Sequence, residues 1–382
     1  MAPWPLMSCA ITPEDKAELI AFIQSTDMYT NGARVIEFEE AWSTWLGCRH
    51  SLFVSSGSTA NFLLLAAVKE LHGLKAGDKV LVPACTWVTN VSPVIQLGLE
   101  PVFCDINLSD FSFDLDKLPS PEGIRVVFVT HLLGIGAPIE ALRARFPDAI
   151  FLEDICESHG VTDSKGVRLG AHSSLGSTFS FYYGHHMTTI EGGMVSTNDT
   201  ELYELMRIKR SHGMARNHSP EVYAAEAARF PHIDPRFLFL TDGYNFRNTE
   251  LAAVLGLSQL KRLDAHIEIR RRNFRRFFTA IDPEKFYVPN LAETNSSFCL
   301  PIICKRAEDM PRLKKLLEAA GIETRPIVAG NLLLHPFLAK WAETPVPNAN
   351  ILNSNGVYVG NSQFVTDAQV DSLVALLLEN VR

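Results

Sequence analysis

The sequence has no long hydrophobic run: none approaches the roughly 20 consecutive apolar residues that a membrane-spanning helix needs. Positive charge is not in excess either, because the 382-residue chain has a formal net charge of −8. These features argue against a membrane protein and against a non-specific nucleic-acid binder. The first residues, Met-Ala-Pro-Trp-Pro-Leu-Met, lack the basic region and apolar core of a secretory signal peptide. We therefore expect a cytoplasmic protein.

Paired cysteines are also missing. The chain has seven cysteines: Cys9, Cys48, Cys85, Cys104, Cys156, Cys299 and Cys304. None belongs to a Cys-x-x-Cys pair, and an odd number at wide spacing does not predict a disulfide framework. We expect most of these residues to be buried free thiols, which pack as small apolar groups.

Short apolar strands alternate with helical segments through the first half of the chain. The expected strands are 51–54, 79–83, 101–105, 125–130 and 149–153, and the helices include 62–71 and 139–146. This alternation implies right-handed crossovers and a mostly parallel sheet. A separate helix should begin at Thr12-Pro13, because threonine caps helices and proline fits their first turn. A further helix is expected over 33–45, ending at Gly47.

A domain boundary is expected near Leu263. Residues 1–262 would form a large domain and residues 263–382 a smaller α/β domain, and the N-terminal helix could pack with either. The small domain should contain a strand over 298–303 and helices over 308–319 and 367–380. Residues 214–239 show little periodicity and predict a long excursion.

A basic cluster marks the helix expected over 261–278. It comprises Arg270, Arg271, Arg272, Arg275 and Arg276. Asp264 and Glu268 lie between or beside them, so a solvated helix face is a better interpretation than a nucleic-acid surface.

Three segments place polar residues where strands end. Residues 55–61, Ser-Ser-Gly-Ser-Thr-Ala-Asn, open a helix, and free N–H groups with the helix dipole favour phosphate there. An ordinary capped helix has the same pattern. Asp154 ends a strand, where a buried acid needs a cationic partner or a ligand. Residues 178–194 contain Ser180-Phe181, then His185, then Glu191-Gly192-Gly193, at a strand exit of the kind that holds ligands in α/β sheets.

These segments resemble the DegT/DnrJ/EryC1/StrS family of pyridoxal-phosphate-dependent nucleotide-sugar enzymes, in the family's order and from about Thr12 onward. The resemblance implies an α/β protein of PLP fold type I, the aspartate aminotransferase-like fold. Its large domain, here 1–262, would bind the cofactor on a mostly parallel mixed sheet.

The resemblance also implies roles for individual residues. Gly57 and Ser58 would form the phosphate loop, and Trp87 would cover the pyridine ring. Asp154 would pair with the pyridine nitrogen, keeping the ring protonated and a better electron sink. Ser180 would be a further cofactor contact.

Three more residues complete the implied site. Glu157 stands where the family usually has glutamine, near the cofactor's ring hydroxyl. Asn245 would reach the cofactor phosphate of the neighbouring subunit, which implies a homodimer. Arg325 would bind the carboxylate of L-glutamate, because its guanidinium fork matches two oxygens.

His185 occupies the position of the family's cofactor lysine. A lysine amine binds the cofactor covalently and moves protons. Imidazole moves protons near neutral pH but cannot form a stable link of that kind. With Ala329-Gly330-Asn331, His185 makes the chain similar to the family's 3-dehydratases. Pyridoxal 5'-phosphate or pyridoxamine 5'-phosphate should therefore be held non-covalently.

The implied reaction removes the 3-hydroxyl of a nucleotide 4-keto-6-deoxy sugar, with L-glutamate regenerating the pyridoxamine form. GDP is the first nucleotide to expect, ahead of CDP and dTDP. A related group of 3-dehydratases uses a [2Fe–2S] cluster on closely spaced cysteines, and this sequence has no such set. We therefore expect no iron–sulfur cluster. We also expect no metal site at His185 and His186, because neighbouring residues on an extended segment point to opposite faces.

Two alternatives stay open. The first is a nucleotide-sugar aminotransferase whose lysine function has moved, although Lys165 and Lys209 lie away from the central segment in sequence. The second is a non-catalytic sugar-nucleotide binding protein, which would explain the lost lysine but not the histidine in its place.

Overall fold

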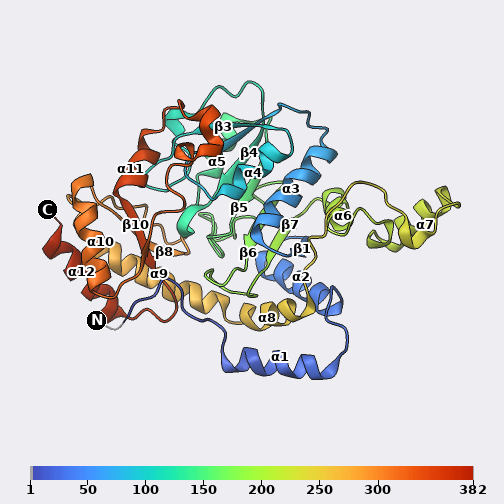
Figure 1. Ribbon diagram of the computed structural model, residues 1–382, viewed down its shortest axis with the longest axis horizontal. Helices are drawn as coiled ribbons and strands as arrows, with labels where there is room; N and C mark the ends of the chain where they lie inside the picture. Colours follow the sequence, from blue (N-terminus) through green and yellow to red (C-terminus); the bar gives the residue numbers. More distant parts are fainter. Residues whose placement is uncertain (1–2, 382) are drawn as a thin grey trace.

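The computed structural model describes residues 3–381, and its centre is a seven-stranded sheet (Figure 1). The strand order is β1-β7-β6-β5-β4-β2-β3. The strands are β1 His50–Val54, β2 Lys79–Pro83, β3 Glu100–Cys104, β4 Ile124–Thr130, β5 Ile150–Asp154, β6 Gly176–Ser180 and β7 Gly193–Thr197. The strands expected from the sequence are confirmed, with bounds shifted by at most one residue.

The sheet is mixed and mostly parallel, as predicted. Strands β3, β2, β4, β5 and β6 pair in parallel, while β7 pairs antiparallel with both β6 and β1. Its strands are buried along most of their length. Because parallel strands share one carboxyl edge, the ends of β2, β4, β5 and β6 meet on one side of the molecule.

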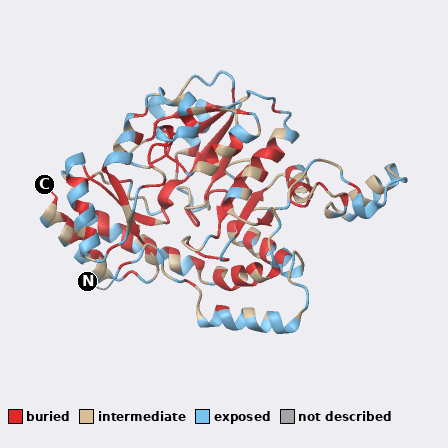
Figure 2. Ribbon diagram, in the orientation of Figure 1, coloured by how far each residue is buried: buried red, intermediate tan, exposed pale blue. Residues whose placement is uncertain are grey.

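Helices cover both faces of this sheet (Figures 1 and 2). The helices up to residue 280 are α1 Pro13–Ser25, α2 Ala33–Leu46, α3 Gly57–Leu71, α4 Ser92–Gln96, α5 Ile139–Arg145, α6 Thr200–Lys209, α7 Pro220–Arg229, α8 Glu250–Leu260 and α9 Leu263–Ala280, of which α1 and α7 lie away from the sheet. Within residues 3–381, no helix is long and apolar enough to cross a membrane.

The expected start of α3 at Phe62 is wrong, because the helix begins five residues earlier. The Ser56 hydroxyl accepts a hydrogen bond from the Thr59 amide, and Thr59 Oγ1 accepts one from the Ser56 amide. This reciprocal capping satisfies two amides that would otherwise be unpaired. The small residues that the sequence placed before the helix are thus its first turn.

The C-terminal part has its own three-stranded antiparallel sheet, in the order β8-β10-β9. Its elements are β8 Cys299–Ile303, β9 Thr324–Arg325, β10 Gly356–Gly360, α10 Met310–Ala319, α11 Pro347–Asn355 and α12 Asp367–Asn380. One apolar cluster joins residues of both sheets, from Leu64 and Phe128 to Leu300 and Leu373. A division at 262/263 remains our proposal.

Helix α1 lies along α8 (Figure 1). Asp15 accepts hydrogen bonds from Ser258 and Gln259 and forms an ion pair with Arg262 at 2.8 Å. The segment before α1 packs instead against the C-terminal part of the molecule. Trp4 is buried against the C-terminal part, where its Nε1 donates to the Gly360 carbonyl at 2.9 Å.

Residues 214–239 extend away from the body of the molecule, which confirms the predicted excursion (Figure 1). The excursion is not fully irregular, however, because it contains α7. This helix begins at Ser219-Pro220 and is rich in alanine and glutamate, residues that favour helix. It is only ten residues long and none of them is buried, so few large apolar side chains mark it in the sequence.

All seven cysteines are free. Cys85, Cys104, Cys299 and Cys304 are buried, whereas Cys9 is exposed and Cys48 and Cys156 are half-buried. The expectation of buried free thiols is confirmed for most of them.

Candidate active site

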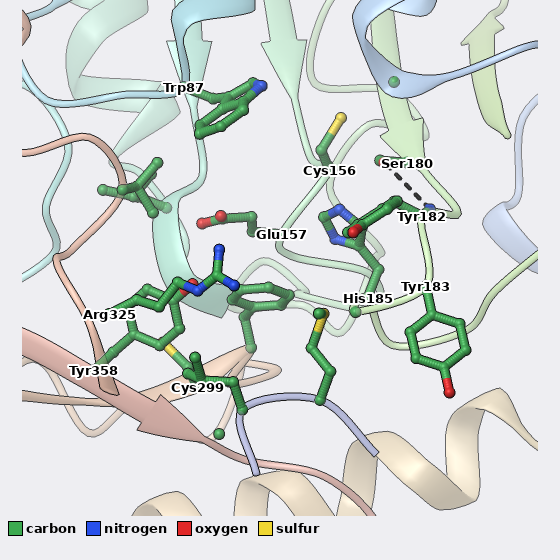
Figure 3. A pocket seen from close by; sticks show the side chains of 18 of the residues that line it. Trp87, Cys156, Glu157, Ser180, Tyr182, Tyr183, His185, Cys299, Arg325 and Tyr358 are labelled. Atoms are coloured by element: carbon green, nitrogen blue, oxygen red, sulfur yellow. Dashed lines mark hydrogen bonds between the residues drawn. The ribbon is translucent and has the colours of Figure 1, made fainter. Parts of the chain in front are cut away.

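A cavity of about 550 Å³ opens where the carboxyl ends of the central strands face the C-terminal part (Figure 3). A volume of this size suits a cofactor together with a substrate. Eight of the nine residues that the sequence singled out line it: Gly57, Ser58, Trp87, Asp154, Glu157, Ser180, His185 and Arg325. Residues separated by up to 268 positions in the sequence therefore meet at one place.

The start of α3 forms one end of the cavity. Gly57 and Ser58 occupy its first turn and line the cavity, and Ser58 is exposed. A Cβ added at Gly57 would lie 2.7 Å from Ser180 Cβ and 3.0 Å from Cys156 Sγ, so only glycine fits. The first turn of a 15-residue helix directs free N–H groups and the positive end of its dipole outward, which suits a phosphate.

Asp154 is held at the end of β5 by two hydrogen bonds. Its carboxylate accepts from Asn61 Nδ2 at 2.8 Å and from the Cys156 amide at 2.9 Å. Asn61 in turn accepts from the Thr178 hydroxyl, which fixes the amide's orientation. Asp154 is buried, and within residues 3–381 it forms no ion pair. A buried, oriented carboxylate of this kind fits a cationic ring nitrogen.

Trp87 follows β2 and is 52% exposed, although it is a large apolar side chain. Figure 3 shows its indole above the cavity, facing the space between Glu157 and Cys156. An exposed indole at a cavity suits a flat aromatic ligand.

Glu157 lies deeper, on the loop after β5. Its carboxylate accepts a hydrogen bond from the Leu133 amide at 3.0 Å. Burial raises the pKa of Glu157 to about 8, and the nearby Asp154 adds to the rise, although the Leu133 amide opposes it. Glu157 therefore carries a proton over much of the neutral range. In that form it can donate a hydrogen bond, as the amide of glutamine would.

His185 lies on the loop between β6 and β7, and its side chain points into the cavity (Figure 3). Its ring packs on Phe298 with centroids 5.3 Å apart, and its Nδ1 has no hydrogen-bond partner within the described chain. Burial and the Arg270 cation lower the pKa of His185 to about 4. A neutral imidazole with a free nitrogen is equipped to accept a proton.

Arg325 lies on the edge strand β9, opposite Tyr358 of β10, and its side chain is exposed at the cavity. The segment that follows is tightly folded. Ala329 and Gly330 both have positive φ, 58° and 66°, and a Cβ at Gly330 would lie 2.1 Å from the Asn353 amide oxygen. Of the Ala-Gly-Asn run, Ala329 lines the cavity, on a backbone whose course the neighbouring Gly330 permits.

Asn245 is the exception among the predicted residues. It is exposed and does not line the cavity of its own chain. Its backbone bridges to Ser211, and its side chain accepts a hydrogen bond from Arg247 at 3.1 Å. Any contact with a cofactor would have to come from another copy of the chain.

The expectation that the basic cluster on α9 is a solvated face is wrong for Arg270. This residue is 4% exposed and lines the cavity. The sequence held a signal for this: Leu263, Ile267, Arg270, Phe274 and Phe277 follow the three- and four-residue spacing of one helix face, and all are buried. Arg270 lies within an apolar stripe, whereas Arg272, Arg275 and Arg276 are exposed ion-pairing residues.

The N-terminal segment was also missed. Leu6, Met7, Ser8 and Ala10 line the cavity. Met7 lies against Gly184, since a Cβ added there would be 2.4 Å from the Met7 sulfur. Nothing in the sequence of this segment indicates where Trp4 anchors it.

The donor set fits pyridoxal phosphate. A helix start that only glycine permits, a buried carboxylate without a cation and an exposed indole surround one cavity. The residues that line it include no lysine. Lys209 is buried elsewhere, in ion pairs with Glu70 and Asp242. No group of three histidine, cysteine or acidic side chains within residues 3–381 is arranged to hold a metal ion.

The mostly parallel seven-stranded sheet, its cavity at the strand ends and the smaller C-terminal sheet are the architecture of PLP fold type I, the aminotransferase-like class. The chain belongs to the DegT/DnrJ/EryC1/StrS aminotransferase family, which matches residues 10–378.

Three known relatives within or near this family are named as 3-dehydratases of a GDP-linked sugar. The chain is 34% identical over 395 aligned positions to GDP-4-keto-6-deoxy-D-mannose 3-dehydratase of Yersinia pseudotuberculosis, covering 99% of this chain and 98% of the relative. The Escherichia coli enzyme of that name with bound hydrated PLP is 31% identical, with a TM-score of 0.90 and coverage of 99% and 100%. A mutant of GDP-4-keto-6-deoxymannose-3-dehydratase with bound GDP-perosamine is 31% identical, with a TM-score of 0.88 and coverage of 98% and 100%.

Proposed function

We propose that this protein removes the 3-hydroxyl of a GDP-linked 4-keto-6-deoxy sugar, GDP-4-keto-6-deoxy-D-mannose first among them, using non-covalently held pyridoxal or pyridoxamine 5'-phosphate. The observation that carries the proposal is His185, which faces a cavity of the right size that no lysine lines. Full-length similarity to 3-dehydratases supports the reaction, and the relative with bound GDP-perosamine supports the nucleotide.

The cofactor would be held by residues from four segments. Gly57 and Ser58 would bind the phosphate at the start of α3, and Trp87 would cover the ring. Asp154 would pair with the ring nitrogen, and protonated Glu157 would donate to the ring oxygen. Ser180 would complete the cradle, since it lies against Gly57. These roles are those that the family resemblance implies, and the chemistry of the side chains supports them.

When bound, the protonated pyridine ring withdraws electrons from the carbon attached to it, which makes hydrogens on that carbon acidic. His185, whose neutral imidazole lines the cavity, would then move a proton at that carbon. Departure of the sugar hydroxyl needs a proton as well, which the same imidazole can return. Both transfers require only that His185 alternate between its neutral and charged forms.

The whole reaction balances with L-glutamate as co-substrate. The sugar hydroxyl leaves as water and its carbon is reduced, while glutamate is oxidised to 2-oxoglutarate, whose carbonyl oxygen comes from water, and its nitrogen is released as ammonia. Arg325 would bind a glutamate carboxylate through its two guanidinium nitrogens. Since its side chain is exposed at the cavity, it is available to do so without any rearrangement.

The proposal includes a homodimer in which Asn245 reaches the phosphate of the partner's cofactor. Two features support this: Asn245 is exposed outside its own cavity, and the excursion over 214–239 carries two exposed apolar side chains, Phe237 and Phe239. A cytoplasmic location fits an enzyme that consumes a nucleotide sugar and glutamate.

The aminotransferase alternative is weaker because it needs a lysine at the cofactor. None lines the cavity, and Lys209 is held by two carboxylates elsewhere. The binding-protein alternative does not explain why a histidine stands at the lysine position and lines the cavity. His185→Asn tests the proposal: both sugar dehydration and glutamate-dependent regeneration should fall at least 100-fold together, whereas retention of either would overturn the assigned role. The matched variant His186→Asn should be milder, because His186 is buried behind the cavity.

A further inference from the structure

Arg270 is a buried cation without a buried anion. The residue is 4% exposed, and within residues 3–381 its guanidinium forms no ion pair. Its Nη1 donates to two backbone carbonyls, those of Phe298 at 2.9 Å and of Asn361. The Asn361 side chain donates back to the Arg270 carbonyl at 3.0 Å. The head group is thus fixed from two sides, while its charge is left uncompensated.

Phe298 connects this cation to the site. Its ring lies 5.3 Å from the ring of His185 and 6.1 Å from that of His186, measured between centroids. The bond from Arg270 to the Phe298 carbonyl therefore holds the aromatic wall against which His185 packs. Removing that bond would loosen the imidazole without touching any substrate.

A third histidine completes a buried cluster. His159 packs beside both rings, with centroids 6.2 Å from His185 and 5.2 Å from His186. The Nδ1 atoms of His159 and His186 face each other at 3.4 Å, so one must be a donor and the other an acceptor. At least one ring of this pair is consequently neutral. The adjacent α9 residue Arg271 also reaches this region, donating to the Gly160 carbonyl at 2.9 Å.

The electrostatic environment of the three histidines favours their neutral form. Burial and the Arg270 charge lower the pKa of His185, His186 and His159, because an added proton would lie near a cation in a desolvated site. The backbone of Cys156 works in the opposite direction at His185. The acids that line the same cavity are Asp154, Glu157 and Glu191, and none of them forms an ion pair with His185 within the described residues.

We propose that Arg270 is a positioning residue for His185: its hydrogen bond to the Phe298 carbonyl fixes the ring against which the imidazole packs, and its unpaired charge, together with burial, opposes protonation of that imidazole. The inference rests on the proposed role of His185 as the group that moves protons. It explains why a cation lies buried beside the residue that must stay uncharged to start the reaction.

The test is a histidine titration of the cofactor-free protein by NMR, with 13C-labelled imidazoles and the His185 signal assigned by its loss in His185→Asn. In the unaltered protein the His185 midpoint should lie near pH 4. Arg270→Gln removes the charge but keeps a hydrogen-bond donor, so the midpoint should move upward by about one on the pH scale. Arg270→Lys keeps the charge and should keep the low midpoint, even where the altered head group loses a carbonyl contact.

Arg271→Gln is the matched control, because Arg271 is the next residue of α9, also bonds backbone carbonyls, and is paired with Glu268. It should leave the His185 midpoint unchanged. A His185 titration midpoint near the ordinary histidine value of about 6.5 in the unaltered protein would overturn the proposal. That result would come from the unaltered protein alone. Equal changes of the midpoint in Arg270→Gln and Arg270→Lys would reduce Arg270 to a structural residue. The titration does not measure turnover, so its result can be interpreted even if the protein does not catalyse the proposed reaction.

Discussion

A Cβ placed on Gly57 would lie 2.7 Å from the Cβ of Ser180, so the start of α3 and the exit of β6 are as close as a glycine allows. This approach brings the free N–H groups of the helix to the point where the central strands end. It is the strongest constraint on the cofactor cradle that the backbone itself supplies.

Gly57→Ala should therefore weaken cofactor binding. The added methyl group forces α3 away from Ser180 and Cys156, which displaces the N–H groups that would bind the phosphate. We expect the dissociation constant for pyridoxal phosphate, measured by fluorescence titration, to rise at least tenfold, equivalent to about 1.4 kcal/mol. Ser58→Ala removes one hydroxyl and leaves the backbone in place, so it should cost less. Equal affinities of Gly57→Ala and the unaltered protein would contradict the cradle.

The cofactor should not become attached covalently. His185 cannot form the bond that lysine forms, and no lysine lines the cavity. After incubation with pyridoxal phosphate and borohydride, intact-mass spectrometry should show an unmodified chain. His185→Lys should gain one reduced cofactor on residue 185, which controls for access. A reduced cofactor on a specific lysine of the unaltered protein would revive the aminotransferase alternative.

Much of this site could be predicted from the sequence because local chemistry marked it. Strand ends indicated Asp154, a small-residue helix start indicated Gly57, and the resemblance identified His185. The start of α3 was misplaced because Ser56 and Thr59 are both turn formers and helix caps, and only their reciprocal bonding decides between these. Helix α7 has only ten residues and none of them is buried, so its sequence carries few large apolar side chains to mark it.

The prediction that Arg270 lies on a solvated helix face was wrong for another reason. A run of arginines suggested a solvated face, yet the helical spacing of Ile267, Arg270 and Phe274 placed one of them inside. The wall formed by Leu6 and Met7 was beyond reach, since it depends on how Trp4 packs against residues more than 300 positions away.

Glu157→Gln should change how stability depends on pH. The folded-state pKa of Glu157 is about 8, above its ordinary value of 4.5. Its contribution to stability is therefore fully present below pH 4.5 and lost as pH rises through 8. The amide cannot ionise, so Glu157→Gln should be more stable than the unaltered cofactor-free protein at pH 8.5. We expect a difference of about 2 kcal/mol, because a tenfold change in proton affinity is worth about 1.4 kcal/mol and partial exposure reduces the total.

Urea unfolding at pH 5 and pH 8.5 measures this difference. Glu191→Gln is the control, since Glu191 is an exposed acid of the same cavity. A stability gain that is the same at both pH values would show that the raised pKa is not its cause.

The shared site of the proposed dimer can be tested by mixing inactive variants. His185→Asn and Asn245→Ala should each be impaired, but a hybrid dimer of the two would contain one intact site if Asn245 acts across the interface. Co-refolded equal mixtures should then recover about a quarter of the unaltered activity. A mixture no more active than its parents would contradict a site built from two chains. Sedimentation velocity of the same samples checks that dimers formed.

The identity of the product tests the central claim most directly. The protein would be incubated with pyridoxal phosphate, L-glutamate and GDP-4-keto-6-deoxy-D-mannose, and the nucleotide sugar analysed by mass spectrometry and NMR. We predict a sugar that has lost the hydroxyl at its third carbon and gained no nitrogen, with 2-oxoglutarate and ammonia formed in equal amounts. A 4-amino sugar that keeps its third hydroxyl would contradict the account.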